Sequence, residues 1–148
     1  MRHVLLVAIF VIFQLSIAVA SEGDKITGVW WNATKTAKIK IVKGVETYSA
    51  DIIFLCDEKG SNGNIKLDKN NPNSNLTSRP LLNLQIVTGL VYDSDKNKWI
   101  NGFIYDPKSG KTFSCLVWLE GNDILKIRAY SKAFPLMSNT VTWLRTTL

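Results

Sequence analysis

Hydrophobic and polar residues alternate along most of the chain after residue 25, in short runs separated by turn-forming residues. In one such run Ile39 and Ile41 are interleaved with Lys38 and Lys40, which gives the segment one apolar and one charged face. Alternation with a period of two predicts a β-strand with one buried face. The same criterion predicts eight strands, at residues 26–31, 37–43, 47–55, 81–90, 99–106, 112–120, 124–130 and 140–145.

Short turns join most of these predicted strands. Pro107 and Gly110 stand at positions that a hairpin turn favours, and Gly121 begins a tight turn. No segment has a convincing helical period. Regularly spaced strands with turn signals predict a sandwich or a barrel. About eight antiparallel strands can close into a barrel that has no exposed edge, so we expect an all-β fold with a single up-and-down β-barrel.

One connection is much longer than the others. Residues 57–80 are rich in Asn, Gly, Ser and Pro and lack any apolar period. Loops of this length in a small domain are usually functional or mobile. The segment is therefore a candidate for contact with a partner.

The first twenty residues form a separate unit. Arg2 is followed by an apolar stretch that runs to Ile17, and a small-x-small sequence ends at Ala20. This order is typical of a secretory signal peptide. A membrane anchor is the alternative, but the apolar stretch is short for one. We expect cleavage after Ala20, a single barrel domain over residues 21–148, and a periplasmic or secreted location in a bacterium.

Removal of this segment leaves 128 of the 148 residues and lowers the net charge from +6 to +5, because Arg2 is lost. It also removes His3, the only histidine. Catalytic triads and histidine-based zinc sites are then excluded. We expect no enzymatic activity and no cofactor. The lysines are scattered through turn-rich segments, so the positive charge does not predict binding to nucleic acid.

Two cysteines remain, and an exported protein meets an oxidising environment in which they could pair. Cys56 and Cys115 each lie in an apolar segment. A disulfide requires Cα atoms within about 7 Å of one another. Two separate buried thiols that act as small hydrophobic residues are the favoured interpretation, and a disulfide stays open as the alternative.

Several longer motifs are distributed over the chain. They are Asp68-Lys69-Asn70-Asn71-Pro72, Ser78-Arg79-Pro80-Leu81-Leu82, Gly89-Leu90, Trp99-Ile100-Asn101-Gly102-Phe103-Ile104-Tyr105-Asp106-Pro107, Gly110-Lys111-Thr112-Phe113, Leu125-Lys126-Ile127-Arg128-Ala129-Tyr130 and Thr142-Trp143-Leu144-Arg145.

With these motifs the chain resembles domain-of-unknown-function family 2147 from Gly28 to Arg145. The resemblance implies a small exported bacterial protein with a lipocalin- or calycin-like barrel, and it implies no known activity. Trp30 near the start and Arg145 near the end also resemble the Gly-x-Trp and late Arg of lipocalins. A guanidinium can stack on an indole ring while it bonds to nearby carbonyls, so we expect this pair to seal one end of the barrel.

Candidate binding residues are arginines, whose planar guanidinium can form two parallel hydrogen bonds, and tyrosines, whose hydroxyl can bond to a polar group of a ligand. Arg79, at the exit of the long loop, is the arginine most open to a functional role. For Arg128 an ion pair with Asp106 or Asp123 is favoured over ligand contact. The predicted ligand-binding residues are Arg79, Tyr105, Arg128 and Tyr130, beside an open cavity bordered by Trp99, Phe103, Tyr105 and Trp118.

Three functions fit these observations. The leading hypothesis is a binding module, expected to be monomeric, that holds a small apolar or amphipathic ligand in the barrel mouth. The rival is an envelope accessory protein with a filled barrel that binds a partner through residues 57–80. A carboxylate-based enzyme is the third. After cleavage we expect a chain that does not span the membrane.

Overall fold

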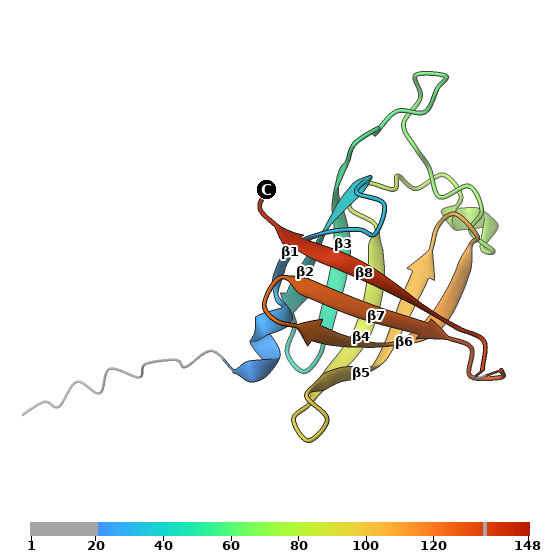
Figure 1. Cartoon of the computed structure of the whole chain (residues 1–148). Helices are drawn as coiled ribbons and strands as arrows, with labels where there is room; N and C mark the ends of the chain where they lie inside the picture. The colour runs from blue at the N-terminus through green and yellow to red at the C-terminus, as the bar shows by residue number, and fades with distance from the viewer. Residues whose placement is uncertain (1–20, 135) are drawn as a thin grey trace, which may run out of the picture.

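The structure is a computed structural model, and it describes residues 21–134 and 136–148 (Figure 1). The predicted signal segment, residues 1–20, lies outside the described residues. The described part of the chain contains no helix with the length and apolar character needed to cross a membrane. Eight strands are present: β1 (Gly28–Trp31), β2 (Ala37–Lys43), β3 (Tyr48–Leu55), β4 (Gln85–Asp93), β5 (Lys98–Asp106), β6 (Lys111–Glu120), β7 (Ile124–Tyr130) and β8 (Ser138–Thr146).

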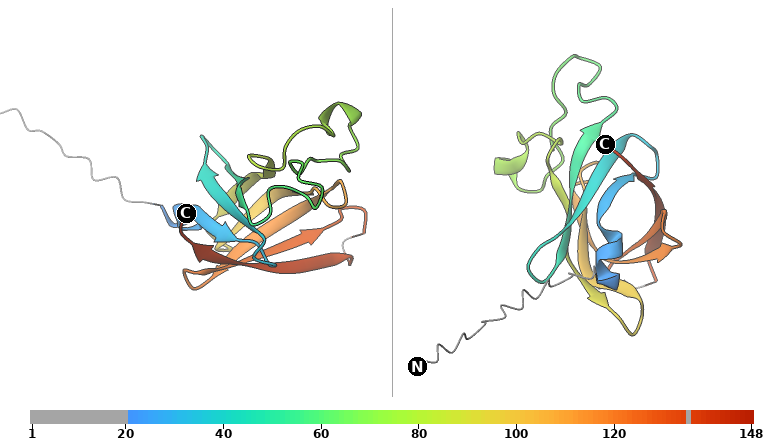
Figure 2. Two further views of the ribbon diagram at one scale, coloured as in Figure 1. Left: turned by 90° about the horizontal axis from the view of Figure 1, so that it is seen from above. Right: turned by 90° about the vertical axis from the view of Figure 1, so that its left-hand side faces the viewer.

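Each strand pairs antiparallel with the next one along the chain, and β1 pairs with β8 to close a barrel. Figure 2 shows β1 and β8, from opposite ends of the chain, lying side by side. In this closing pair Trp30 stands opposite Arg145. The predicted all-β, up-and-down barrel of about eight strands is confirmed.

The alternation of apolar and polar residues directs side chains into or out of this barrel. Ile39 and Ile41 of β2 are buried, whereas Lys40 between them is exposed. Leu125 and Ile127 of β7 follow the same rule. Because successive residues of a strand point to opposite sides, the inward set of all eight strands forms one apolar core.

The barrel has two different ends. At the closed end lie residues 21–27, which include the short 3-10 helix η1 (Glu22–Ile26), and the loops 44–47, 94–97 and 121–123. At the open end lie the loops 32–36, 56–84, 107–110 and 131–137; the longest contains the 3-10 helix η2 (Ser74–Leu76). The strand order places these two sets of loops at opposite ends.

Three predicted strands begin two or more residues away from the observed start, and the last of them begins at Ser138 and not at residue 140. The first begins at Gly28 and not at residue 26, because Ile26 completes η1. The fourth spans Gln85–Asp93 and not residues 81–90. Asn83 has a φ of +66°, a turn conformation that interrupts an extended strand.

Simple alternation along residues 99–106 predicts that Trp99, Asn101, Phe103 and Tyr105 share one face, and this prediction is wrong. Asn101 has a φ of +62°, and the pairing of β5 with β6 shifts between Trp99 and Gly102. A bulge of this kind reverses the inward and outward positions that follow it. Trp99 is therefore buried in the core, whereas Phe103 lies on the outside and is 43% exposed.

Candidate functional site

The closed end is sealed by Arg145. Its guanidinium carbon lies 4.1 Å from the centroid of the Trp30 ring. The guanidinium also donates to three backbone carbonyl oxygens, those of Lys25 (2.7 Å), Thr27 (2.9 Å) and Asn122 (2.7 Å). The predicted stacking of Arg145 on Trp30 is confirmed, and its hydrogen bonds tie η1 and the 121–123 loop to the barrel.

A second group of polar contacts holds η1 over this end. Trp99 Nε1 donates to the Gly23 carbonyl oxygen at 3.0 Å, and the Tyr48 hydroxyl donates to Asp24 Oδ1 at 2.7 Å. The Lys43 ammonium lies 2.7 Å from the same carboxylate oxygen. The hydrogen bonds from Lys43 and Tyr48 lower the pKa of Asp24 to about 2. With Trp30 and Trp99 almost fully buried, this end presents a closed wall.

The open end, in contrast, is hollowed. A cavity of about 650 Å³ lies between the 32–36 turn, the end of β3 and the β5–β6 hairpin. Its floor is apolar and consists of Ala37, Ile52, Leu55 and Leu81. We call this cavity the mouth. Polar side chains form its rim: Asn32, Thr34, Thr36, Asp57, Lys66, Asp106 and Lys108.

Two contacts define the rim on the β3 side. Lys66 Nζ lies 2.9 Å from Asp57 Oδ2, so that these two charges neutralise each other. Cys56 is exposed, and its thiol donates to the Lys35 carbonyl oxygen at 3.3 Å. An apolar floor below polar and charged side chains suits a ligand with an apolar body and a polar end.

A buried carboxylate organises the long loop beside the mouth. Asp68 is fully buried and accepts hydrogen bonds from Arg79 Nε (2.9 Å), Arg79 Nη2 (2.8 Å), the Tyr105 hydroxyl (2.5 Å) and Asn71 Nδ2 (2.7 Å). Burial by itself would raise the pKa of Asp68, but the hydrogen bonds from Tyr105, Asn71 and Arg79 outweigh it and hold the pKa below its usual value. The 57–80 loop is thus anchored from within.

The same loop is fastened to the β5–β6 hairpin. Asn70 Nδ2 donates to the Lys108 carbonyl oxygen at 2.7 Å. Gly110 has a φ of +69°, and a Cβ at this position would overlap the Asn70 carbonyl oxygen. Only glycine permits so close an approach in this conformation. The loop and the hairpin together form one wall of the open end.

The four predicted binding residues do not form one site: two of them lie together, and the other two lie elsewhere on the barrel. Arg79 and Tyr105 come together on Asp68, with the Arg79 guanidinium carbon 5.7 Å from the Tyr105 ring centroid. Neither lines the mouth. Arg128 is exposed on the outer side of β7, and Tyr130 borders an outer groove. A direct role in binding stays a prediction for all four.

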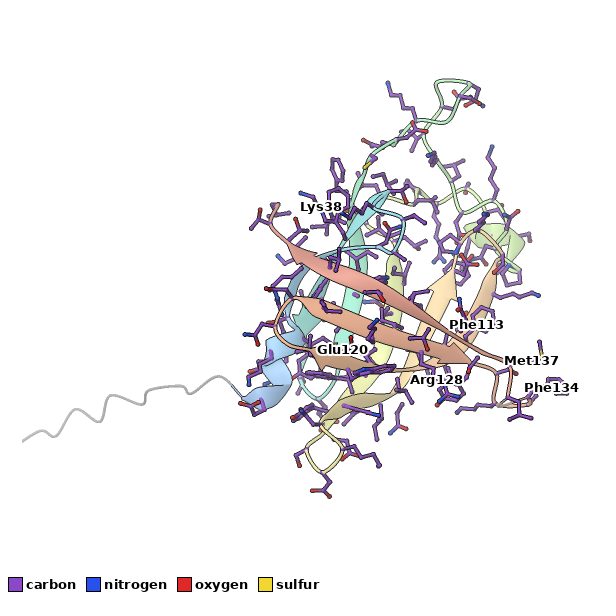
Figure 3. The ribbon with its side chains drawn as sticks, in the orientation of Figure 1. Lys38, Phe113, Glu120, Arg128, Phe134 and Met137 are labelled. Carbon is purple, nitrogen blue, oxygen red and sulfur yellow. The ribbon has the colours of Figure 1, made fainter. Side chains whose placement is uncertain are left out.

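The expected ion pair of Arg128 with Asp106 or Asp123 is not formed within residues 21–134 and 136–148. Asp123 lies 3.5 Å from Arg145 instead. Asp106 accepts from the Lys108 backbone N–H and the Ser109 hydroxyl within its own turn. Figure 3 labels Arg128 on β7.

Of the four residues predicted to border an open cavity, Phe103 borders one, a hollow of about 510 Å³ that Tyr130 also lines and that shares no lining residue with the mouth. Trp99 is only 1% exposed, within the core. Trp118 follows the inward Val117 and so lies outside, with Lys98 Nζ 5.4 Å from its ring centroid. The bulge at Asn101 explains why Trp99 points into the barrel and Phe103 points out of it, because the inward positions of β5 after the bulge no longer follow simple alternation.

Sequence reasoning missed the residues that form and support the mouth. Lys66 and Lys108 had no distinguishing pattern, because each stands in a polar turn, and Cys56 at the end of an apolar run was interpreted only as a buried thiol or a disulfide partner. Asp68 offered a weak signal as the first residue of the Asp68–Pro72 motif. A carboxylate in a polar loop is usually solvated, so the complete burial of Asp68 could not be predicted from the residues around it in the sequence.

The two cysteines are separate free thiols, as favoured from the sequence, but the expected burial is confirmed for Cys115 and wrong for Cys56, which follows the end of β3. Cys56 is exposed at the rim of the mouth, whereas Cys115 is buried in the barrel. Burial raises the pKa of Cys115 to about 12. An added Cβ at Gly102 would lie 2.9 Å from Cys115 Sγ and would overlap the Leu90 side chain. The barrel is therefore filled at this level, and the mouth is shallow.

The barrel and its sequence can now be compared with known proteins. Residues 28–145 match the family described as "Uncharacterized protein conserved in bacteria (DUF2147)". The chain belongs to this family. The resemblance inferred from the motifs is thereby confirmed. No curated protein matches the chain significantly.

Among solved structures, the barrel is similar to protein HP1028 from the human pathogen Helicobacter pylori, which is described as belonging to the lipocalin family. The two chains share 22% sequence identity over 82% of each, with a TM-score of 0.69. At this identity the similarity establishes a common fold. The DUF2147 chain therefore has a lipocalin-like barrel.

Proposed function

We propose that this DUF2147 protein is an exported, non-enzymatic binding module that holds a small apolar or amphipathic ligand in the mouth of its barrel. The observation that carries the proposal is the mouth itself, a cavity of about 650 Å³ with an apolar floor at the open end of the barrel. Ligand pockets in proteins usually have volumes of about 300–1,000 Å³ and a mainly apolar lining.

The depth of the barrel limits what can enter. Leu90 and Cys115 fill the interior at the level of Gly102, and the tryptophans close the far end. A ligand would therefore place a short apolar portion against Ile52 and Leu55 and leave its polar portion at the rim. This arrangement supports an amphipathic molecule over one that is fully buried.

The rim offers donors for such a polar group. Lys108 is exposed on the rim and has no ion pair within the described residues, whereas Lys66 is already paired with Asp57. Arg79 and Tyr105 would act as positioning residues, since they hold the 57–80 loop through Asp68 and so fix Leu81 in the floor. Tyr130 would contact a ligand in the outer groove, whereas Arg128 lines neither this groove nor the mouth.

Cys56 provides a direct test, because it borders the mouth and is exposed. Protein purified from its own host would be studied by native mass spectrometry for a retained small molecule. In parallel, binding of the fluorescent amphiphile 1-anilinonaphthalene-8-sulfonate would be measured before and after alkylation of Cys56 with a bulky maleimide. We expect alkylation to abolish probe binding, and Cys56→Ser to bind the probe whether or not the reagent is added.

Two results would contradict the proposal. Probe binding that survives alkylation of Cys56 would place the probe outside the mouth. A protein that carries no small molecule and binds no probe would favour the rival function, in which the 57–80 loop binds a protein partner.

A further inference from the structure

The loop between β7 and β8 displays large apolar side chains to solvent. Phe134 is 65% exposed, Leu136 99% and Met137 71%. Figure 3 shows Phe134 and Met137 on a loop that projects beyond the ends of the strands. Three such residues within four positions form a concentrated apolar tip, unlike the single exposed apolar residues that most surfaces carry. We call Phe134, Leu136 and Met137 the apolar tip.

Hydrogen bonds within the loop hold this tip outward. The backbone N–H of Met137 donates to the Phe134 carbonyl oxygen at 2.9 Å. The Ser131 N–H donates to the Met137 carbonyl oxygen, and the Phe134 N–H donates to the Ser131 hydroxyl, both at 3.4 Å. A closed turn of this kind keeps the side chains on its outer side.

The end of the barrel that carries the apolar tip is also strongly basic. The open-end loops hold seven cationic residues and three acids, whereas the closed-end loops hold two cationic residues and five acids. The open-end cations are Lys35, Lys59, Lys66, Lys69, Arg79, Lys108 and Lys132, and the acids are Asp57, Glu58 and Asp68. The closed-end cations are Lys25 and Lys96, and the acids are Glu22, Asp24, Glu46, Asp95 and Asp123.

Ion pairs leave the net charge of the open-end loops unchanged, but they use up most of the acids in these loops. Two of the three open-end acids are already neutralised, Asp57 by Lys66 at 2.9 Å and Asp68 by Arg79 at 2.8 Å. Five lysines of the open-end loops have no ion pair within the described part of the chain, and the acids without an ion pair at this end are Glu58 and Asp106, the last residue of β5. These five are Lys35, Lys59, Lys69, Lys108 and Lys132.

We propose that the open end docks on the surface of a bilayer that contains anionic phospholipids, with the apolar tip inserted at the boundary of headgroups and acyl chains. Apolar side chains that enter this boundary together with basic residues that meet the headgroups are the two contributions that bind peripheral proteins to membranes. The inference goes beyond the proposed ligand binding and does not depend on it.

The charge distribution favours a bilayer over a protein partner. The apolar tip projects beyond the strand ends (Figure 3), and Leu136 and Met137 also line a hollow of about 380 Å³ beside it. The lysines are distributed over all four open-end loops and do not form one compact patch. A broad anionic surface meets such a distribution more completely than a single acidic site on a protein.

The matched pair Leu136 and Val45 tests the proposal, because both are 99% exposed but lie at opposite ends of the barrel. Wild type, Leu136→Ser and Val45→Ser would be compared by co-sedimentation with vesicles of phosphatidylcholine containing about 30% phosphatidylglycerol. All three proteins would carry the same N-terminus. We expect Leu136→Ser to weaken vesicle binding about tenfold, and Val45→Ser to leave it unchanged.

Charge is tested with Lys132 and Lys96, which lie in open-end and closed-end loops respectively. We expect Lys132→Ala to weaken binding about fivefold and Lys96→Ala to have little effect. Vesicles of phosphatidylcholine alone should bind the wild type poorly, and added salt should release it from the anionic vesicles. A Leu136→Trp variant should show a blue-shifted emission that brominated lipids quench.

Three outcomes would overturn the proposal. The first is a wild type that does not sediment with the anionic vesicles. The second is equal loss of binding in Leu136→Ser and Val45→Ser. The third is an emission change in the Leu136→Trp variant that brominated lipids leave unquenched, which would show that the tip stays in water; capture of a protein partner by this loop would then be the remaining use of the tip.

Discussion

The guanidinium carbon of Arg145 lies 4.1 Å from the ring centroid of Trp30, in the one strand pair that joins the beginning of the described chain to its end. The contact also links the two terminal strands of the barrel. Through the carbonyl oxygens of Lys25 and Thr27 the same guanidinium holds the segment that enters β1. One side chain thus supports both the backbone pairing that closes the barrel and the seal of the closed end.

Replacement of Arg145 by lysine should destabilise the protein although the charge is kept. An ammonium cannot stack as a plane on Trp30 and at the same time reach three carbonyl oxygens. We expect the free energy of unfolding to fall by about 1–3 kcal/mol in urea denaturation. Arg128→Lys is the control, because Arg128 is exposed on β7 and should change stability by less than about 0.5 kcal/mol. Equal effects of the two substitutions would refute this assignment.

Gly110 and Gly121 form a matched pair for the contact between the long loop and the β5–β6 hairpin. Their φ values are +69° and +70°, but only an added Cβ at Gly110 would strike the Asn70 carbonyl oxygen. Gly121→Ala should cost about 1 kcal/mol for its backbone conformation alone. Gly110→Ala should cost more and should increase amide hydrogen exchange in residues 57–80. If both variants behave alike, the loop is not fastened at Asn70.

Protonation of Asp24 at low pH should lower the stability of the closed end. Its pKa of about 2 lies below the ordinary value of 3.8, because the hydrogen bonds from Lys43 and Tyr48 favour the carboxylate. The stabilisation is therefore present above pH 4 and is lost as the pH falls through 2. We expect the stability of wild type and Asp24→Asn to differ at about pH 6 and to converge near pH 2, measured by thermal unfolding. A constant difference over this range would exclude the linkage.

The two thiols should differ in reactivity. A maleimide added to the native protein at about pH 8 should modify Cys56, which is exposed, and spare Cys115, whose burial raises its pKa to about 12. Mass spectrometry should show one adduct in the native state and two after denaturation. Two rapid adducts in the native state would mean that the barrel opens readily.

Export is tested on the protein made by its own host. If residues 1–20 are a signal peptide, the protein recovered from the cell envelope or the medium should begin at Ser21. Mass analysis of the intact chain would measure this directly. An intact Met1 in the envelope fraction would favour a membrane anchor.

Local pattern predicted most of the barrel because each strand carries its own alternation. Residues 37–43 and 124–130 were placed without error, since their inward residues are regularly spaced and turns bound them. The Trp30–Arg145 contact was also predicted, on the resemblance and on the chemistry of the two side chains. The register failed at Asn101, because a bulge adds one residue without changing the composition of the strand.

The candidate site was harder to predict, because its residues meet only in three dimensions. Arg79 and Tyr105 were chosen for their donors, but Asp68 uses those donors to hold the loop. Nothing near Asp68 in the sequence indicates that residue 105 will lie beside it. The mouth depends on Ala37, Ile52 and Leu81, which look like ordinary core residues until the loops around them are placed.

Pairing of β1 with β8 gives every strand of the barrel two hydrogen-bonded neighbours. A peptide therefore cannot extend this sheet by adding a strand, which is a common way for β-proteins to recruit partners and also to aggregate. Recognition has to use side chains of the loops or of the outer faces. Sequence changes in those loops could then alter what the protein binds while the hydrogen-bonded framework stays the same.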